Sequence, residues 1–166
     1  MRIGGYMDKT ELERCADDSA HLGDCFRKIG FSAFDAPMLE RCAEFMRLAP
    51  SIDFQFDIMP DGSLSDTFGL SLSFNETKPR EAHACIESGY GAAVMRALQS
   101  WSLADDRWKV IADAAFARHV GYERDDGTEG RFALCICFNY AKVKFRACEP
   151  QPAKFYFTCI AGDVEG

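Results

Sequence analysis

Residues 131–160, RFALCICFNYAKVKFRACEPQPAKFYFTCI, decide the fold that the sequence predicts. The first part alternates apolar with small residues, the middle alternates apolar with basic residues, and a Pro-rich turn precedes a second basic, aromatic segment. Successive side chains point to opposite faces of a β-strand, so this pattern predicts consecutive antiparallel strands. If the last two strands pair, one face of the sheet carries Lys142, Lys144, Arg146, Lys154 and Tyr156.

This accumulation of positive charge has two interpretations. Neighbouring like charges repel each other, so a protein that gathers them on one face commonly binds an anionic ligand there. Lysines are also frequent on exposed edge strands, where they prevent aggregation through unpaired strand edges. The sequence leaves both interpretations open.

The composition of the chain limits its function classes. With 166 residues, 48% of them hydrophobic, the chain is expected to form one domain over 1–166. The formal net charge of −7 argues against general binding to nucleic acid or to an anionic membrane surface. No apolar run approaches the length of a membrane span. We therefore expect neither a nucleic-acid partner nor a membrane partner.

The eight cysteines predict reduced thiols in a cytoplasmic protein. Those in helical patterns are Cys15, Cys25, Cys42 and Cys85. Cys135 and Cys137 share one face of a predicted strand, and residues 1–30 do not have the pattern of a secretory signal peptide, so a disulfide framework is not expected. Because no Cys-x-x-Cys or Cys-x-x-His pair is present, we expect no metal site and no cofactor.

The N-terminal part, 1–50, is predicted to be mainly helical. Residues 1–7 read as a loose terminus, 8–30 as one helix, and 38–49 as a second helix with apolar residues at helical spacing. Beyond it, residues 52–59 and 67–74 predict a hairpin, since the intervening Pro-Asp-Gly-Ser segment is typical of a turn.

The rest of the chain predicts two more helices and further strands. The helices are expected over 79–101 and over 104–115, and the strands over 116–122, 132–138, 141–146 and 153–159. This order predicts an α+β fold over 51–160: an antiparallel sheet, open or curved into a partial barrel, with helices on its apolar outer face. The polar face would then bring Asp53 and Asp57 together with the basic residues.

The pattern of helix pairs, antiparallel hairpins and a polar inner sheet face resembles the αββα-barrel (ABBA) prenyltransferases of aromatic compounds and peptides. The segments Lys142-Val143-Lys144-Phe145 and Ala153-Lys154-Phe155-Tyr156-Phe157 are similar to that family's basic strands. The resemblance covers about residues 51–160. The family closes a full barrel, whereas this chain predicts four to six strands. The smaller number of strands implies one of three relationships. The chain is a truncated or miniature relative, or it closes its barrel by self-association, or the likeness is one of architecture alone.

The resemblance implies alkylation of an aromatic or peptide acceptor by an isoprenyl diphosphate. Lys142, Lys144, Arg146 and Lys154 would bind the diphosphate and stabilise its departure. Tyr156 would face the allylic cation through its ring, and Asp53 or Asp57 would accept the proton that the acceptor loses. No Asp-Asp-x-x-Asp motif for a diphosphate–magnesium complex is present.

The alternative function is a non-catalytic module that binds a peptide or protein of a biosynthetic cluster. A polar sheet with basic strands suits an acidic peptide, and open sheet edges invite strand addition. Unpaired edges also predict a homo-oligomer or a partner chain that completes the sheet. Nucleophilic catalysis is not expected, because His21, His83 and His119 form no recognisable spacing with a Ser or Cys.

Overall fold

The computed structural model describes residues 1–49, 51–74, 85, 89–110 and 116–163. Within these residues the strands form one seven-stranded, antiparallel sheet that does not close into a barrel. The strands are β1 (Arg2–Tyr6), β2 (Ile52–Ile58), β3 (Leu64–Ser73), β4 (Phe116–Glu123), β5 (Glu129–Arg146), β6 (Glu149–Pro150) and β7 (Lys154–Asp163). The helices are α1 (Lys9–Asp17), α2 (Ser19–Lys28), α3 (Ala36–Leu48) and α5 (Tyr90–Ser100). The predicted α+β fold with an open antiparallel sheet is confirmed.

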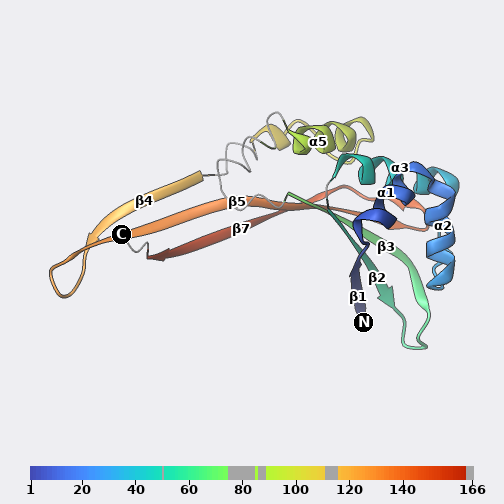
Figure 1. Ribbon diagram of the computed structural model, residues 1–166, viewed down its shortest axis with the longest axis horizontal. Helices are drawn as coiled ribbons and strands as arrows, with labels where there is room; N and C mark the ends of the chain where they lie inside the picture. Colours follow the sequence, from blue (N-terminus) through green and yellow to red (C-terminus); the bar gives the residue numbers. More distant parts are fainter. Residues whose placement is uncertain (50, 75–84, 86–88, 111–115, 164–166) are drawn as a thin grey trace.

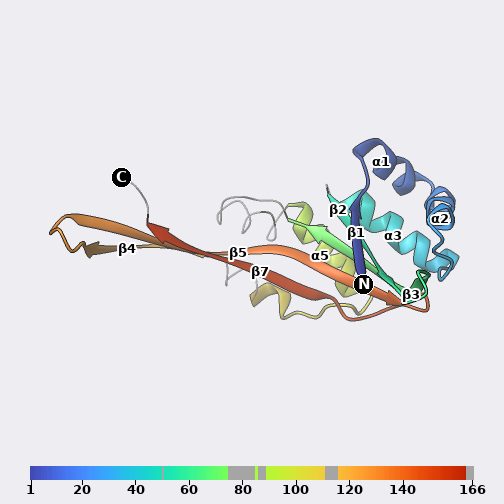
Figure 2. The same ribbon diagram turned by 90° about the horizontal axis from the view of Figure 1, so that it is seen from below.

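Strand β5 is the centre of the sheet. Its C-terminal half pairs with β3 and its N-terminal half with β4, while β7 runs along its other side. The N-terminal half of β5 forms with β4 and β7 a three-stranded arm (116–123, 129–138 and 157–163) that extends away from the helices (Figures 1 and 2). The sheet therefore has a helix-covered part and a projecting part.

A β-bulge at Asn139 joins two segments that the sequence predicts as separate strands. Phe138 pairs with Phe157 and Tyr140 pairs with Tyr156, so Asn139 is the extra residue. The extra residue reverses the alternation of side chains along β5. For this reason Phe138 lies on the helix-covered face, with 4.5 Å between its ring centroid and that of Phe74. It shares this face with the buried Ala141 three positions later, although regular alternation would place residues three apart on opposite faces.

The core lies between the helices and the apolar face of β2, β3 and β5. Its strand residues include Phe54, Phe56, Phe68, Leu70, Leu72, Val143 and Phe145, all buried. Phe26 of α2 packs edge-on against Phe68, with 5.0 Å between ring centroids. Each such side chain contributes about 1.5–3 kcal/mol when it is removed from water. The polar face opposite the helices is therefore fixed by burial of the apolar one.

The expectation of a loose terminus at 1–7 is wrong, and 1–50 is not helical throughout. Residues 2–6 form β1, which pairs with β2 in the register Arg2–Asp57 to Tyr6–Asp53. The backbone of Met1 is also paired with Ile58: the terminal amino group donates to its carbonyl at 3.0 Å. Pairing with β1 gives hydrogen-bond partners to the backbone N–H and C=O groups along the edge of β2. This gain outweighs the low strand propensity of Gly4 and Gly5.

The single helix predicted for 8–30 is instead two helices. The chain breaks at Asp18, whose carboxylate accepts hydrogen bonds from the backbone N–H groups of Ala20 at 2.9 Å and His21 at 3.3 Å. An Asp in this position caps the free N–H groups of a new helix, and so α2 starts there. The break turns α2 so that both helices place apolar residues in the core.

Of the other predicted elements, some are confirmed and others are confirmed only in part. The helix over 38–49 corresponds to α3, and the hairpin to β2 and β3. Residues 90–100 of the helix predicted for 79–101 form α5, which starts after Gly89, whereas 79–84 and 86–88 lie outside the described residues. Of the helix predicted for 104–115, residues 104–107 form a bend and a turn instead of helix, 108–110 are helical, and 111–115 lie outside the described residues. No helix in the described ranges is long and apolar enough to cross a membrane.

Candidate functional site

The basic residues lie on the sheet face opposite the helices, here called the basic face. Strand register aligns its side chains in rows across the sheet. The face comprises Arg2, Tyr6, Asp53, Gln55, Asp57, Gly69, Ser71, Tyr140, Lys142, Lys144, Arg146, Lys154 and Tyr156. One row runs from Tyr6 through Asp53, Ser71 and Lys142 to Lys154. The register thus brings the predicted basic residues and both carboxylates onto one surface.

The edge-strand interpretation does not apply to Lys142 and Lys144. At these positions β5 is an interior strand, since β3 pairs with it on one side and β7 or the turn after β6 lies on the other. Lys154 stands on β7, which within the described residues pairs only with β5. The charges of the interior lysines therefore need another explanation than protection of an edge.

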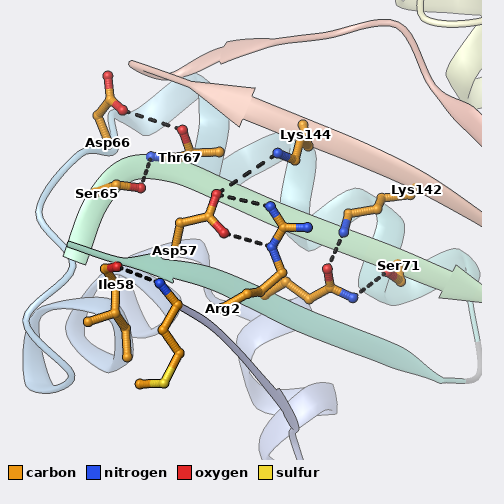
Figure 3. Close-up of polar contacts among 11 residues, drawn as sticks. Arg2, Asp57, Ile58, Ser65, Asp66, Thr67, Ser71, Lys142 and Lys144 are labelled. Atoms are coloured by element: carbon orange, nitrogen blue, oxygen red, sulfur yellow. Dashed lines mark hydrogen bonds and ion pairs between the residues drawn. The ribbon is translucent and has the colours of Figure 1, made fainter. Parts of the chain in front are cut away.

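Arg2 holds the carboxylate of Asp57. Arg2 Nε donates to Asp57 Oδ1 at 2.6 Å and Arg2 Nη2 donates to Oδ2 at 3.1 Å, while Lys144 Nζ lies 4.0 Å from Oδ2 (Figure 3). The hydrogen bonds from Arg2 hold the pKa of Asp57 below its ordinary value. Asp57 is therefore a fixed counter-ion and a weak proton acceptor. Arg2 was not identified from the sequence, because nothing in 1–7 predicts which strand it joins.

Lys142 is buried within the basic face. Its side chain is 8% exposed, and its Nζ donates to Gln55 Oε1, whose Nε2 donates to Ser71 Oγ at 3.4 Å (Figure 3). Gly69 leaves the room for it: a Cβ on Gly69 would lie 3.1 Å from Lys142 Cε. Burial, and then the charges of Arg2 and Lys144, lower the pKa of Lys142. Lys142 is thus part of the internal hydrogen-bond network.

The cations that face solvent are the remaining three predicted ones. Lys144 is half-buried, with its side chain 37% exposed, whereas Arg146 and Lys154 are exposed. Arg146 also has an acidic neighbour, because Glu149 of β6 pairs with it across the strands. Lys154 and Arg146 are therefore the predicted cations most exposed to solvent, and Lys144 is partly accessible beside Asp57.

Two tyrosines stack beside the lysine pair. Tyr140 and Tyr156 lie 4.4 Å apart between ring centroids, with 14° between their planes. They occupy the row next to Lys142 and Lys154. Tyr156 was predicted as a site residue and Tyr140 was not, although Tyr140 lies two residues before Lys142, so that alternation along the strand already places it on this face.

Asp53 differs from Asp57 in its surroundings. Its Oδ1 is buried and has no hydrogen-bond partner among the described residues. Burial raises the pKa of Asp53. A carboxylate that is poorly solvated and unpaired accepts a proton more readily. Of the two predicted carboxylates, Asp53 is therefore better suited to act as a base.

A second cluster of reactive side chains lies between α1 and α2. His21 Nε2 is 2.7 Å from Glu11 Oε1, and Cys25 Sγ donates to the same oxygen at 3.2 Å. Cys25 Sγ also lies 3.8 Å from His21 Nε2. In a nucleophile–base–acid triad the histidine uses different nitrogens for its two partners. Here both partners meet Nε2, and burial raises the pKa of Cys25, so this is no activated thiol.

The sequence motifs Cys-x-x-Cys and Cys-x-x-His do not reveal this cluster, because its residues have another spacing. The available signal was a Glu-x-x-x-Cys pair in one helix followed by a His-x-x-x-Cys pair in the next. Residues four apart lie on the same side of a helix. The signal becomes visible once the break at Asp18 is known.

Comparisons of this chain with protein-family models, with curated proteins and with solved structures give no match. The residues of the basic face therefore carry the information on function.

Proposed function

We propose that the basic face binds a diphosphate group, and that the ligand is an isoprenyl diphosphate whose isoprenyl group is transferred to an aromatic or peptide acceptor. One observation carries the proposal: Lys142 and Lys154 lie directly opposite each other, with Lys144 and Arg146 on the same face. Like charges gathered on one face destabilise a sheet by themselves, and an anion bound by the cations that reach solvent lowers that cost.

The ligand's diphosphate would contact the exposed Lys154 and the half-buried Lys144. The carbon–oxygen bond to the diphosphate breaks, and its electron pair leaves on the diphosphate, where the positive charges stabilise it. The stacked rings of Tyr140 and Tyr156 offer their electron-rich faces to the allylic cation. The acceptor supplies the electron pair of the new bond and loses a proton to the carboxylate of Asp53.

This assignment gives the two predicted catalytic carboxylates different roles. Asp53 takes the role of base, whereas Asp57, held by Arg2, keeps the positive charges in place. Lys142 supports the face from within rather than touching the ligand. We also propose a cytoplasmic location, in line with the seven described cysteines that are free of disulfides.

The open sheet favours a second candidate function. Because the sheet does not close, its basic face is not a lumen and could equally hold an acidic peptide or a partner protein. In that case the cations of the basic face recognise carboxylates, and no bond is made or broken.

Calorimetric titration separates these functions. Dimethylallyl diphosphate, geranyl diphosphate and pyrophosphate should each bind, more weakly at higher ionic strength because salt screens exposed charges. Loss of one charge-assisted contact in Lys144→Ala or Lys154→Ala should weaken binding roughly tenfold to a hundredfold. Lys9→Ala is the matched control, since Lys9 is 88% exposed on α1, away from the basic face.

Product formation is tested with tyrosine- and tryptophan-containing peptides, followed by mass spectrometry. Alkylated peptide that is lost in Asp53→Asn, with donor binding retained, supports the transferase. Failure of all three compounds to bind at millimolar concentration refutes it and favours the peptide- or protein-binding function.

A further inference from the structure

We infer that Glu11, Cys15, His21 and Cys25 form a zinc site that fastens α1 to α2. This site is separate from the basic face and does not depend on the function proposed for it. Each of the four side chains offers one ligand atom, and these atoms all lie within 4.8 Å of one another. Two thiolates, an imidazole and a carboxylate are ligands that Zn²⁺ takes in proteins.

The two helices are built to bring these ligands together. Glu11 and Cys15 are four residues apart on α1, and His21 and Cys25 are four residues apart on α2. Each pair therefore projects from one side of its helix. The Asp18 cap ends one helix and starts the next, so that the two sides face each other.

The distances fit a tetrahedral ion after a small adjustment. With bonds of about 2.3 Å to sulfur and about 2.0–2.1 Å to nitrogen or oxygen, tetrahedral ligand atoms stand about 3.4–3.8 Å apart. The separations here are 2.7 Å for His21–Glu11, 3.2 Å for Cys25–Glu11 and 3.8 Å for Cys25–His21. Cys15 Sγ lies within 4.8 Å of each of the other three ligand atoms. Side-chain movements of about 1 Å, outward for the short pairs and inward for pairs near that limit, give an ion tetrahedral room.

Burial and charge also suit a structural ion. Cys15 is fully buried and the His21 side chain is 12% exposed, so the protein can fill all four positions, as structural zinc sites require. Three anionic ligands leave one negative charge in excess of the dication. Arg14 and Lys28 lie close enough to act electrostatically on Glu11 and Cys25, and they offset that charge.

The thiols select the metal. Mg²⁺ and Ca²⁺ prefer sites made only of oxygen ligands, whereas thiolate and imidazole together favour Zn²⁺. Zn²⁺ has no redox chemistry, so a site closed by four protein ligands holds the helices together rather than performing catalysis.

The test uses the full chain, reduced and stripped of metal. We expect it to bind about one equivalent of Zn²⁺. Co²⁺ in the same site should give thiolate-to-cobalt charge-transfer absorption and the intense visible bands of a tetrahedral complex. Both should be lost in Cys25→Ser and His21→Gln, and retained in Cys159→Ser and His119→Gln, which remove an exposed thiol and an exposed imidazole elsewhere.

A second measurement needs no variant that has to fold. In the wild-type chain, Zn²⁺ should slow alkylation of the partly exposed Cys25 while leaving Cys159 reactive, as read by mass spectrometry of the peptides. Substoichiometric zinc overturns the inference, and so does cobalt absorption that survives Cys25→Ser. Equal alkylation of Cys25 with and without zinc overturns it too.

Discussion

Lys142 and Lys154 lie directly opposite each other on β5 and β7, yet their surroundings differ. Lys142 is 8% exposed and donates to Gln55, whereas Lys154 is exposed. A pair that looks equivalent in the sequence thus consists of one internal lysine and one lysine available to a ligand. The strand register places both lysines on the basic face, and their different burial gives them different roles.

The first prediction concerns the internal lysine. Gln55→Leu removes the acceptor of a buried ammonium group and should destabilise the fold by about 1–3 kcal/mol. In a Lys142→Met background no buried charge remains, so Gln55→Leu should cost less there. Urea unfolding of the four proteins measures the coupling. An equal cost in both backgrounds contradicts the role given to Gln55.

The second prediction concerns the pH dependence of the Arg2–Asp57 pair. Because the pKa of Asp57 is lowered in the folded protein, the unfolded chain takes up a proton first as the pH falls. The contribution of the pair is therefore complete above the ordinary carboxyl pKa of 3.8 and is lost as the pH falls below it. Arg2→Ala should be less stable than wild type at neutral pH and should approach it in acid.

Urea midpoints measured from neutral pH down to about pH 3 check this dependence. Lys9→Ala is the matched control, since its ion pair with Glu13 has both side chains more than half exposed. Such a pair contributes little to stability, so this variant should follow the wild-type curve. A constant difference between Arg2→Ala and wild type across the pH range contradicts the prediction.

The third prediction concerns the bulge. Deletion of Asn139 restores simple alternation along β5, so either Phe138 leaves the core or the lysines enter it. The loss should reach about 3 kcal/mol or more, as for removal of a large core side chain. Asn139→Ser keeps the extra residue and loses only the hydrogen bond to Thr158, at about 1 kcal/mol. Denaturant unfolding measures both, and similar stability of the two variants contradicts the role of the bulge.

The fourth prediction concerns the arm. Val120 and Phe132 are paired neighbours on one face of the arm and are 55% and 38% exposed, and Phe157 on the same face is 43% exposed. We expect this apolar face to associate with a second copy of the chain. Phe132→Ser should weaken the association about tenfold, measured by analytical ultracentrifugation. Ile29→Ser, at an exposed apolar position beyond α2, is the control. A monomer at all concentrations would leave only a partner chain as occupant.

The local pattern of the sequence determined the strands and the two-sidedness of the sheet. Alternation of apolar and polar residues acts within a few residues, so it predicted the hairpin of β2 and β3 and the basic face with Lys144 and Lys154. Helical spacing predicted α3 in the same way. The predicted fold class and the shared face of the basic residues follow from these local rules.

Tertiary structure alone decided what depends on distant partners. β1 forms because the edge of β2 offers pairing and Asp57 offers an ion partner for Arg2. The burial of Lys142 depends on Gln55 and Gly69, which come from two other strands. The Glu11–Cys25 cluster depends on the turn at Asp18. Such contacts join residues far apart in the chain or across a break in a helix, so no local periodicity of the sequence contains them.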